Sequence, residues 1–337
     1  MKKFRDSLNI ISKITFTRAW NLLLVQVSYY LTLLFRKPVV WGKPFSVSIE
    51  PTTSCNLRCP ECPSGIRQFS RNTGMLSYDL YTKIVDEIGS RLMYMILYFQ
   101  GEPYLNPSFF EIVKDARKRK IYTATSTNAH FLTAENARKT VESGLDRIIV
   151  SLDGIGQETY ASYRIGGRYQ RVIEGIETLV KWKRELKSST PHIILQFIVF
   201  RTNEHQVEEV KALSKKLGVD ELQLKTAQVY EYKNGNPLIP TIDKYSRYRQ
   251  KKDGTWEIKN DFPDKCYRMS VSCVITWDGL VVPCCFDKDA IHQMGDLKKD
   301  SFDAVWKNPV YQEFRTRVFT QRKSVDICTN CTEGMEL

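Results

Sequence analysis

Residues 45–62, FSVSIEPTTSCNLRCPEC, join a short apolar strand pattern to three closely spaced cysteines. The segment 45–50 predicts a β-strand because valine, isoleucine and phenylalanine alternate with polar residues. Cys55, Cys59 and Cys62 follow in the spacing C-x3-C-x2-C, which places them on the loop after that strand. In α/β proteins the functional site lies at this end of the strands.

Strand and helix patterns then alternate along the chain. Further strands are expected at 95–99, 121–126, 147–152, 192–200 and 221–226, with helices between them. Ser77 is expected to cap the first of these helices, and Ser108–Glu111 has the sequence of a capping box. Six such units predict a parallel sheet covered by helices, with right-handed crossovers. We therefore expect an α/β fold with a partial (β/α)6 TIM-like barrel, two units short of a closed one.

The first cysteine motif has the donors of a metal centre with an open position. Three thiolates can converge on one centre, and neither a fourth cysteine nor a histidine lies near them in the sequence. Three protein ligands leave one position of a zinc ion, or one iron of a four-iron cluster, free for another ligand. A zinc knuckle completed by a distant residue is the alternative on spacing alone, but the six strand–helix units argue against it.

A second cysteine group lies near the C-terminal end of the sequence. It comprises Cys266, Cys273, Cys284, Cys285, Cys328 and Cys331. Asp278-Gly279 lies between two apolar runs and predicts a two-residue hairpin turn, which would place Cys273 opposite Cys284. The odd total of nine cysteines and the tight spacings indicate metal or cluster ligation in a reducing compartment, not a disulfide scaffold.

The first motif, its position after the first strand and the motifs that follow it resemble the radical SAM enzymes. The resemblance implies a [4Fe–4S] cluster held by Cys55, Cys59 and Cys62, whose open iron chelates S-adenosylmethionine (SAM). It also implies reductive cleavage of SAM to a 5′-deoxyadenosyl radical. Glu61 departs from the family pattern, which usually has an aromatic residue near the adenine at this position.

Polar residues at the ends of the next strands resemble the SAM-contacting motifs of that family. The resemblance assigns Gln100, Gly101, Glu102 and Pro103 to the SAM amino group, with glutamine in place of the usual first glycine. It further assigns Thr127 and Asn128 to the same rim, Ser151 and Asp153 to the ribose, and Arg164 to the carboxylate. Taken singly these motifs are weak, but they recur at successive strand ends. The sequence does not identify a catalytic residue beyond these cofactor contacts.

The second cysteine group resembles the SPASM and shortened twitch domains of radical SAM enzymes, which hold auxiliary [4Fe–4S] clusters. The resemblance implies one auxiliary cluster, with Cys266, Cys284, Cys328 and Cys331 as ligands and Cys273 as a rival to Cys266. A full SPASM domain has further cysteines after the final C-x2-C, and this sequence has none. A zinc ribbon is the alternative. We expect a small C-terminal iron–sulfur domain built from a β-hairpin plus a helix.

The sequence therefore divides into four predicted segments. They are a basic, apolar helical segment (1–44), the partial barrel (45–231), a linker with a small hairpin (232–262) and the auxiliary cluster domain (263–337). The net charge is +12, and residues 1–43 hold eight Lys and Arg residues against one Asp. The rest of the chain has no basic stripe with interleaved aromatic residues, so no nucleic-acid partner is expected.

Residues 19–35 form an apolar run that is shorter than the ~20 residues of a membrane-spanning helix. Asn21, Ser28 and Thr32 fall near one face of this helix. Three alternatives stay open: a helix packed on the protein body, an interfacial helix whose basic flanks meet anionic lipid, and a true membrane span. We expect a cytoplasmic protein, with peripheral contact to the inner face of the membrane through residues 1–44 left open.

The resemblance therefore implies a radical SAM enzyme that abstracts a substrate hydrogen and takes its electron from a donor such as flavodoxin or ferredoxin. Relatives with such C-terminal domains oxidise sugar or cyclitol alcohols, or modify peptides, and peptide-modifying members often carry an N-terminal winged domain. Residues 1–44 are too short and apolar for that domain, which favours a small-molecule, glycan or lipid-linked substrate. The alternatives are a peptide-modifying radical SAM enzyme and, in another class, a non-catalytic iron–sulfur or zinc scaffold or electron carrier.

Overall fold

The computed structural model describes residues 2–332 and contains a nine-stranded sheet. Six of its strands are parallel neighbours in chain order: β1 (Ser46–Ile49), β2 (Tyr94–Ile96), β3 (Tyr122–Thr127), β4 (Arg147–Ser151), β5 (His192–Val199) and β6 (Glu221–Thr226). These are the six strands that the sequence pattern predicts. The α/β fold with a partial barrel is therefore confirmed.

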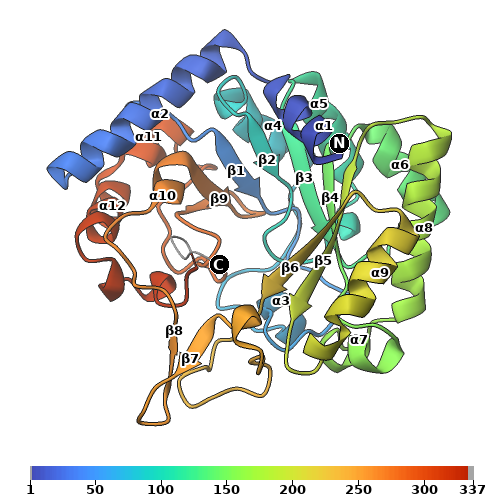
Figure 1. Ribbon diagram of the computed structural model, residues 1–337. Helices are drawn as coiled ribbons and strands as arrows, with labels where there is room; N and C mark the ends of the chain where they lie inside the picture. The colour runs from blue at the N-terminus through green and yellow to red at the C-terminus, as the bar shows by residue number, and fades with distance from the viewer. Residues whose placement is uncertain (1, 333–337) are drawn as a thin grey trace.

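Five long helices cover the outer face of these strands (Figure 1). They are α4 (Tyr78–Ile88), α5 (Phe109–Lys118), α6 (Ala134–Ser143), α8 (Tyr169–Glu185) and α9 (Val207–Leu217). Each turns an apolar stripe toward the sheet; in α4 this stripe includes Ile84, Val85 and Ile88, all nearly inaccessible to water. Shorter helices in the connections are α3 (Pro63–Ile66), η1 (Pro103–Leu105), α7 (Gln157–Tyr163) and η2 (Glu204–Gln206).

The N-terminal cap predicted for α4 is observed, whereas the cap predicted for α5 is not. Ser77 caps α4 as expected, because its side chain accepts a hydrogen bond from the N–H of Leu80. The capping box predicted at Ser108–Glu111 is wrong, since the Ser108 side chain makes no capping bond. Instead the Asn106 side chain accepts from the N–H of Ser108 at 2.8 Å and turns the chain into α5.

The C-terminal part of the chain extends the same sheet instead of standing apart from it. Its strand β9 (Ser272–Ile275) pairs in parallel with β1, and β10 (Leu280–Val282) and β11 (Gly295–Asp296) follow antiparallel. Its helices are α10 (Tyr267–Val271), α11 (Phe302–Lys307), α12 (Pro309–Thr320), η4 (Arg322–Ser324) and η5 (Asp326–Cys328). Before it, residues 232–262 carry η3 (Asp243–Tyr245) and the small hairpin β7 (Tyr248–Gln250) and β8 (Trp256–Ile258).

The β9–β10 hairpin differs from the predicted register by one residue. The N–H of Thr276 bonds to the carbonyl of Leu280, so the loop has three residues and Gly279 takes a left-handed φ of 91°. A three-residue loop that ends in a left-handed glycine is the next most common hairpin connection after the two-residue turn. The observed pairing sets Val282 opposite Val274, so Cys273 does not stand opposite Cys284.

Two N-terminal helices, α1 (Lys2–Ile11) and α2 (Phe16–Phe35), lie against the amino end and one side of the barrel (Figure 1). The buried carboxylate of Asp6 in α1 pairs with Arg147 and accepts from the hydroxyl of Tyr122. The Asn9 side chain donates to Asp146 at 2.7 Å. Across residues 2–332, none of the helices combines the length and the apolar character that crossing a bilayer requires.

Candidate functional site

The three cysteines of the first motif lie on the loop between β1 and α3, at the carboxyl end of the barrel strands. Cys59 is buried, whereas Cys55 and Cys62 are half-buried. Helix α3 turns back against this loop directly after Cys62. A Cβ atom at Gly65 would lie 2.3 Å from the carbonyl oxygen of Cys59, so only glycine allows this close approach.

A cavity of about 160 Å³ opens beside these thiols. Its walls are polar groups from the ends of neighbouring strands, among them Glu102, Ser126, Thr127, Asn128, Ser151 and Arg164. Each thiol has a polar neighbour at 3.8 Å: Asn128 Nδ2 for Cys55, Arg164 Nη1 for Cys59, and Gln100 Oε1 for Cys62. The parallel sheet thus gathers side chains that are far apart in sequence around one group of sulfurs.

The three thiols have the chemistry of cluster ligands. They line one cavity, and in a four-iron cluster each of three cysteines binds a different iron and leaves the fourth iron open. Burial raises the pKa of Cys55 to about 11, so ligation must displace a proton there.

Glu102 joins the ends of β2 and β3. Its carboxylate is almost fully buried and accepts from Thr127 Oγ1 and from the N–H of Asn128, both at 2.8 Å. Burial raises the pKa of Glu102 to about 7, and these two donors oppose the shift. Gly101 has a φ of 74°, and a Cβ there would lie 2.3 Å from the carbonyl oxygen of Thr52. The glycine is therefore required for this loop to cross the segment before Cys55.

Asp153 holds Arg164 in place. One oxygen of Asp153 pairs with Arg164 Nε at 2.6 Å, and the other accepts from the N–H of Ile198 at 2.8 Å. Burial by itself would lower the pKa of Arg164. Asp153 and Cys59 raise this pKa by more than burial lowers it, so it lies well above its usual value. The guanidinium is thus a permanent cation at the cavity wall. Both oxygens of Asp153 thus have partners within the protein. The ribose contact expected of Asp153 stays a prediction.

The predicted SAM-contacting residues fall into two groups. Those that line the cavity are Gly101, Glu102, Thr127, Asn128, Ser151 and Arg164. Gln100, Pro103 and Asp153 are not among the residues that line it, and Gln100 lines a second cavity instead. Sequence reasoning missed Tyr98, Phe99 and Tyr163, which also line the cavity. Tyr98 and Phe99 directly precede Gln100 in the strand pattern, and that position is the signal that could have found them.

Glu61 points away from the cavity. Its carboxylate accepts from the N–H of Tyr230 at 2.9 Å and from Asn236 Nδ2 at 3.4 Å. The residue that replaces the usual aromatic side chain therefore fastens residues 230–236 to the cysteine loop.

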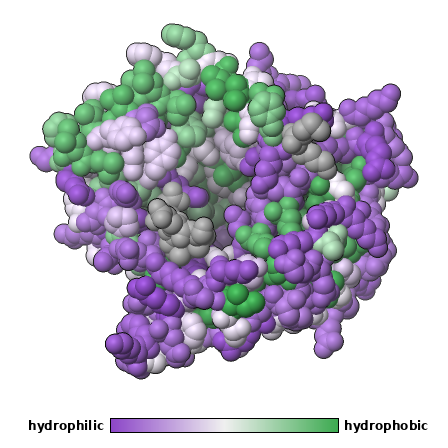
Figure 2. Space-filling model, viewed as in Figure 1, coloured by the Kyte–Doolittle hydropathy of each residue, from purple (hydrophilic) through white to green (hydrophobic). Residues whose placement is uncertain are grey.

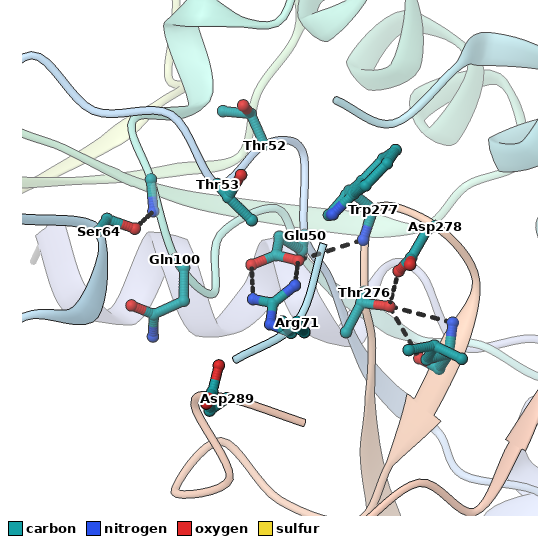
Figure 3. Close-up of polar contacts among 12 residues, drawn as sticks. Glu50, Thr52, Thr53, Ser64, Arg71, Gln100, Thr276, Trp277, Asp278 and Asp289 are labelled. Atoms are coloured by element: carbon teal, nitrogen blue, oxygen red, sulfur yellow. Dashed lines mark hydrogen bonds and ion pairs between the residues drawn. The ribbon is translucent and has the colours of Figure 1, made fainter. Parts of the chain in front are cut away.

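A buried ion pair links the cysteine loop to the C-terminal hairpin (Figure 3). Arg71 donates to both oxygens of Glu50, at 2.8 and 2.6 Å, and the N–H of Trp277 donates to the same carboxylate at 3.2 Å. Glu50 has no exposed surface, and the Arg71 side chain is 5% exposed. Nearby, Asp289 accepts from the N–H of Ser70. The segments that carry the two cysteine groups are thus held together by charged groups.

Arg322 lies among the cysteines of the second group. Its side chain is buried, its Nη2 donates to Cys331 Sγ at 3.5 Å, and Cys266 and Cys328 lie close enough to act on it electrostatically. Burial lowers the pKa of Arg322, but these thiols outweigh that effect and raise it. Cys284 lies within electrostatic range of Cys266. The four cysteines assigned to the auxiliary cluster are therefore neighbours, and their ligation stays a prediction.

Cys273 lies on β9 opposite Val47 of β1. It is 2% exposed, and burial raises its pKa to about 12. Cys273 does not pair with Cys284 across the hairpin, but both line the cavity described below, so its rivalry with Cys266 stays a prediction.

A second cavity, of about 400 Å³, lies between the two cysteine groups. Gln100, which contacts Cys62, lines one part of it, and Cys284 and Cys285 line another. The remaining walls are mainly apolar and aromatic, with Arg268 and Lys288 as cations.

Two family models match this chain, one around each cysteine group. Residues 49–211 match the model of the Radical SAM superfamily, and residues 266–332 match SPASM, an iron–sulfur cluster-binding domain. A cofactor-modifying protein of tungsten-containing aldehyde ferredoxin oxidoreductase from Pyrococcus furiosus is 27% identical over 84% of this chain and 86% of its own. A PqqA peptide cyclase from Bradyrhizobium diazoefficiens is 26% identical over 72% of this chain and 67% of its own.

Among solved structures, BtrN in complex with AdoMet and 2-DOIA has the same fold. It superposes with a TM-score of 0.54 at 17% identity, covering 87% of this chain and 94% of its own.

Arg71→Met should destabilise the protein by about 3–5 kcal/mol, because it leaves the Glu50 carboxylate buried without its cation. Burial raises the pKa of Glu50, so acidification should protonate it and shrink the loss, whereas the full loss should persist at neutral and higher pH. Urea unfolding of the reconstituted protein at several pH values measures this. The double variant Glu50→Gln/Arg71→Met is the control, and it should be more stable than Arg71→Met alone. Equal stability of parent and Arg71→Met would contradict the proposed constraint.

Arg322→Met should weaken retention of the auxiliary cluster by about tenfold, since the cation stabilises anionic cysteine ligands. Iron and sulfide per chain after anaerobic desalting, with the visible absorbance of the cluster, measure the effect. Lys323→Met is the matched control because this neighbouring cation is exposed. Identical iron content in the two variants would show that Arg322 does not act on the cluster.

Proposed function

Because the chain belongs to the radical SAM superfamily and carries a SPASM-type iron–sulfur domain, we propose that it abstracts a hydrogen atom from a peptide substrate. It is an enzyme whose cofactors are SAM, a SAM-binding [4Fe–4S] cluster and an auxiliary [4Fe–4S] cluster. The observation that carries the proposal is the polar cavity beside Cys55, Cys59 and Cys62, together with a second cavity that shares Tyr98 and Phe99 with it and is lined by Cys284 and Cys285.

The residues of the first cavity have separate tasks in this proposal. Cys55, Cys59 and Cys62 would hold the cluster, and the cluster with SAM supplies a 5′-deoxyadenosyl radical for hydrogen abstraction. Arg164, oriented by Asp153, presents a fixed cation to the SAM carboxylate. Ser151 offers a hydroxyl at the cavity wall, where the family resemblance puts the ribose.

Apolar side chains shield Cys59 from water. Leu57 is 1% exposed and Tyr163 is 7% exposed, and both pack in the cluster of apolar residues that includes Cys59. Excluding water on this side strengthens the electrostatic interactions at the buried thiol.

A peptide substrate has better support than the small-molecule, glycan or lipid-linked substrate that the short N-terminal segment favours. The support comes from relatives named PqqA peptide cyclase, which match over about 70% of this chain. The second cavity suits a peptide segment with apolar side chains, and Arg268 and Lys288 are placed to meet an acidic side chain. Burial lowers the pKa of Lys288, and a carboxylate beside it would raise that pKa again.

The test measures 5′-deoxyadenosine release from SAM by anaerobically reconstituted protein with dithionite. Release is expected from the parent and none from the Cys55/Cys59/Cys62→Ala variant, because that variant loses the cluster ligands. Adding a pool of short synthetic peptides with acidic and apolar residues should then raise the release of 5′-deoxyadenosine. Mass spectrometry should show that the modified peptides have lost hydrogen. An inert parent overturns the radical chemistry. An active parent that ignores peptides but modifies components of a lipid extract overturns only the peptide assignment.

A further inference from the structure

Helix α2 buries its polar side chains and exposes its apolar ones. Its buried residues are Arg18, Asn21, Val25, Ser28 and Thr32. On the opposite side Phe16, Trp20, Leu23, Tyr30, Leu34 and Phe35 are all at least half exposed, up to 86% for Phe16. We call these six residues the outer face of α2. Figure 2 shows the hydrophobic surface that follows this helix along one edge of the molecule.

The buried side of α2 is fixed by hydrogen bonds to main-chain groups. The guanidinium of Arg18 donates to the carbonyls of Gly89 and Arg119, which follow the last residues of α4 and α5. Helix ends have unpaired carbonyls and a partial negative charge, so a buried cation is stabilised there. The start of α2 is thereby tied to the barrel helices.

The rest of that polar stripe binds the extended segment 39–43. Asn21 exchanges two hydrogen bonds of 2.9 Å with the main chain of Lys43. Ser28 Oγ accepts from the N–H of Trp41 at 3.0 Å, and Thr32 Oγ1 accepts from the N–H of Val39 at 2.9 Å. Rotation of α2 to bury its outer face would break all of these bonds. The helix is thus packed on the protein body and presents a fixed apolar surface outward.

The carboxyl end of the outer face is cationic. Arg36 and Lys37 are exposed there, directly after Phe35. Residues 1–43 contain a single acid, Asp6, and it is buried against Arg147. An anionic surface therefore complements this end of the helix.

We propose that the outer face of α2 docks on the surface of an anionic lipid bilayer, with the helix lying in the plane of the headgroups. Apolar side chains enter the acyl boundary, Arg36 and Lys37 meet anionic headgroups, and the exposed Trp20 and Tyr30 suit the interfacial layer. The inference is independent of the substrate of the enzyme.

The test is flotation of the full chain with vesicles of phosphatidylcholine, either pure or containing one third phosphatidylglycerol. The parent should float with the anionic vesicles, and binding to pure phosphatidylcholine should be at least about tenfold weaker, since several cations lose their partners. Trp20→Ser/Leu34→Ser should weaken binding to the anionic vesicles by about a hundredfold, because two large side chains no longer enter the lipid.

The matched control is Ile242→Ser/Ile291→Ser, which removes two exposed apolar side chains outside the N-terminal helices and should float like the parent. Iron content and circular dichroism of all variants check that they fold alike. Equal flotation of Trp20→Ser/Leu34→Ser and the parent overturns the proposal, as does equal binding to both vesicle types. A parent that ignores vesicles but forms dimers, which Trp20→Ser/Leu34→Ser converts to monomers in light scattering, assigns the outer face to self-association and also overturns it.

Discussion

The bidentate pair between Glu50 and Arg71 is the constraint on which the arrangement of the two cysteine groups depends. Glu50 ends the first strand pattern, Arg71 follows the cysteine loop, and Trp277 at the hairpin tip donates to the same carboxylate. A charge without exposed surface is tolerable only where cations and N–H groups surround it, so these three segments cannot separate without leaving a buried ion unpaired. Together with the pairing of β1 and β9, this ion pair fixes the cysteine loop against the C-terminal hairpin.

The same principle operates at the other strand ends. Glu102 and Asp153 are buried carboxylates that hold neighbouring strand ends and a cation in register, and each does so with both oxygens. These residues match family motifs, yet their observed contacts are with the protein itself. A cavity for an anionic, flexible cofactor needs walls that do not move, and buried hydrogen-bonded carboxylates provide rigid walls.

Much of this architecture is readable from the sequence because it rests on local patterns. Six strands, the Ser77 cap and the cysteine positions follow from periodicity and spacing. The errors arise where two local solutions are nearly equivalent: Asp278-Gly279 fits both a two-residue and a three-residue hairpin loop, and Asn106 competes with Ser108 to start α5. The orientation of α2 was not decidable, since Asn21, Ser28 and Thr32 become inward-facing only when residues 39–43 supply main-chain partners. Likewise, no local signal marks Arg322 as the cation among the distant cysteines.

The parallel pairing of β1 with β9 has a consequence for the order of events during synthesis. The hydrogen-bonding edge of β1 is exposed until residues 272–275 have been synthesised. Over the same interval the Glu50 carboxylate lacks the hydrogen bond from the N–H of Trp277. Contacts between segments so far apart in sequence form late and slowly, and an open strand edge invites pairing with other chains meanwhile. A ribosome-bound chain that lacks its last strands therefore presents the first cysteine motif beside an unsatisfied sheet edge.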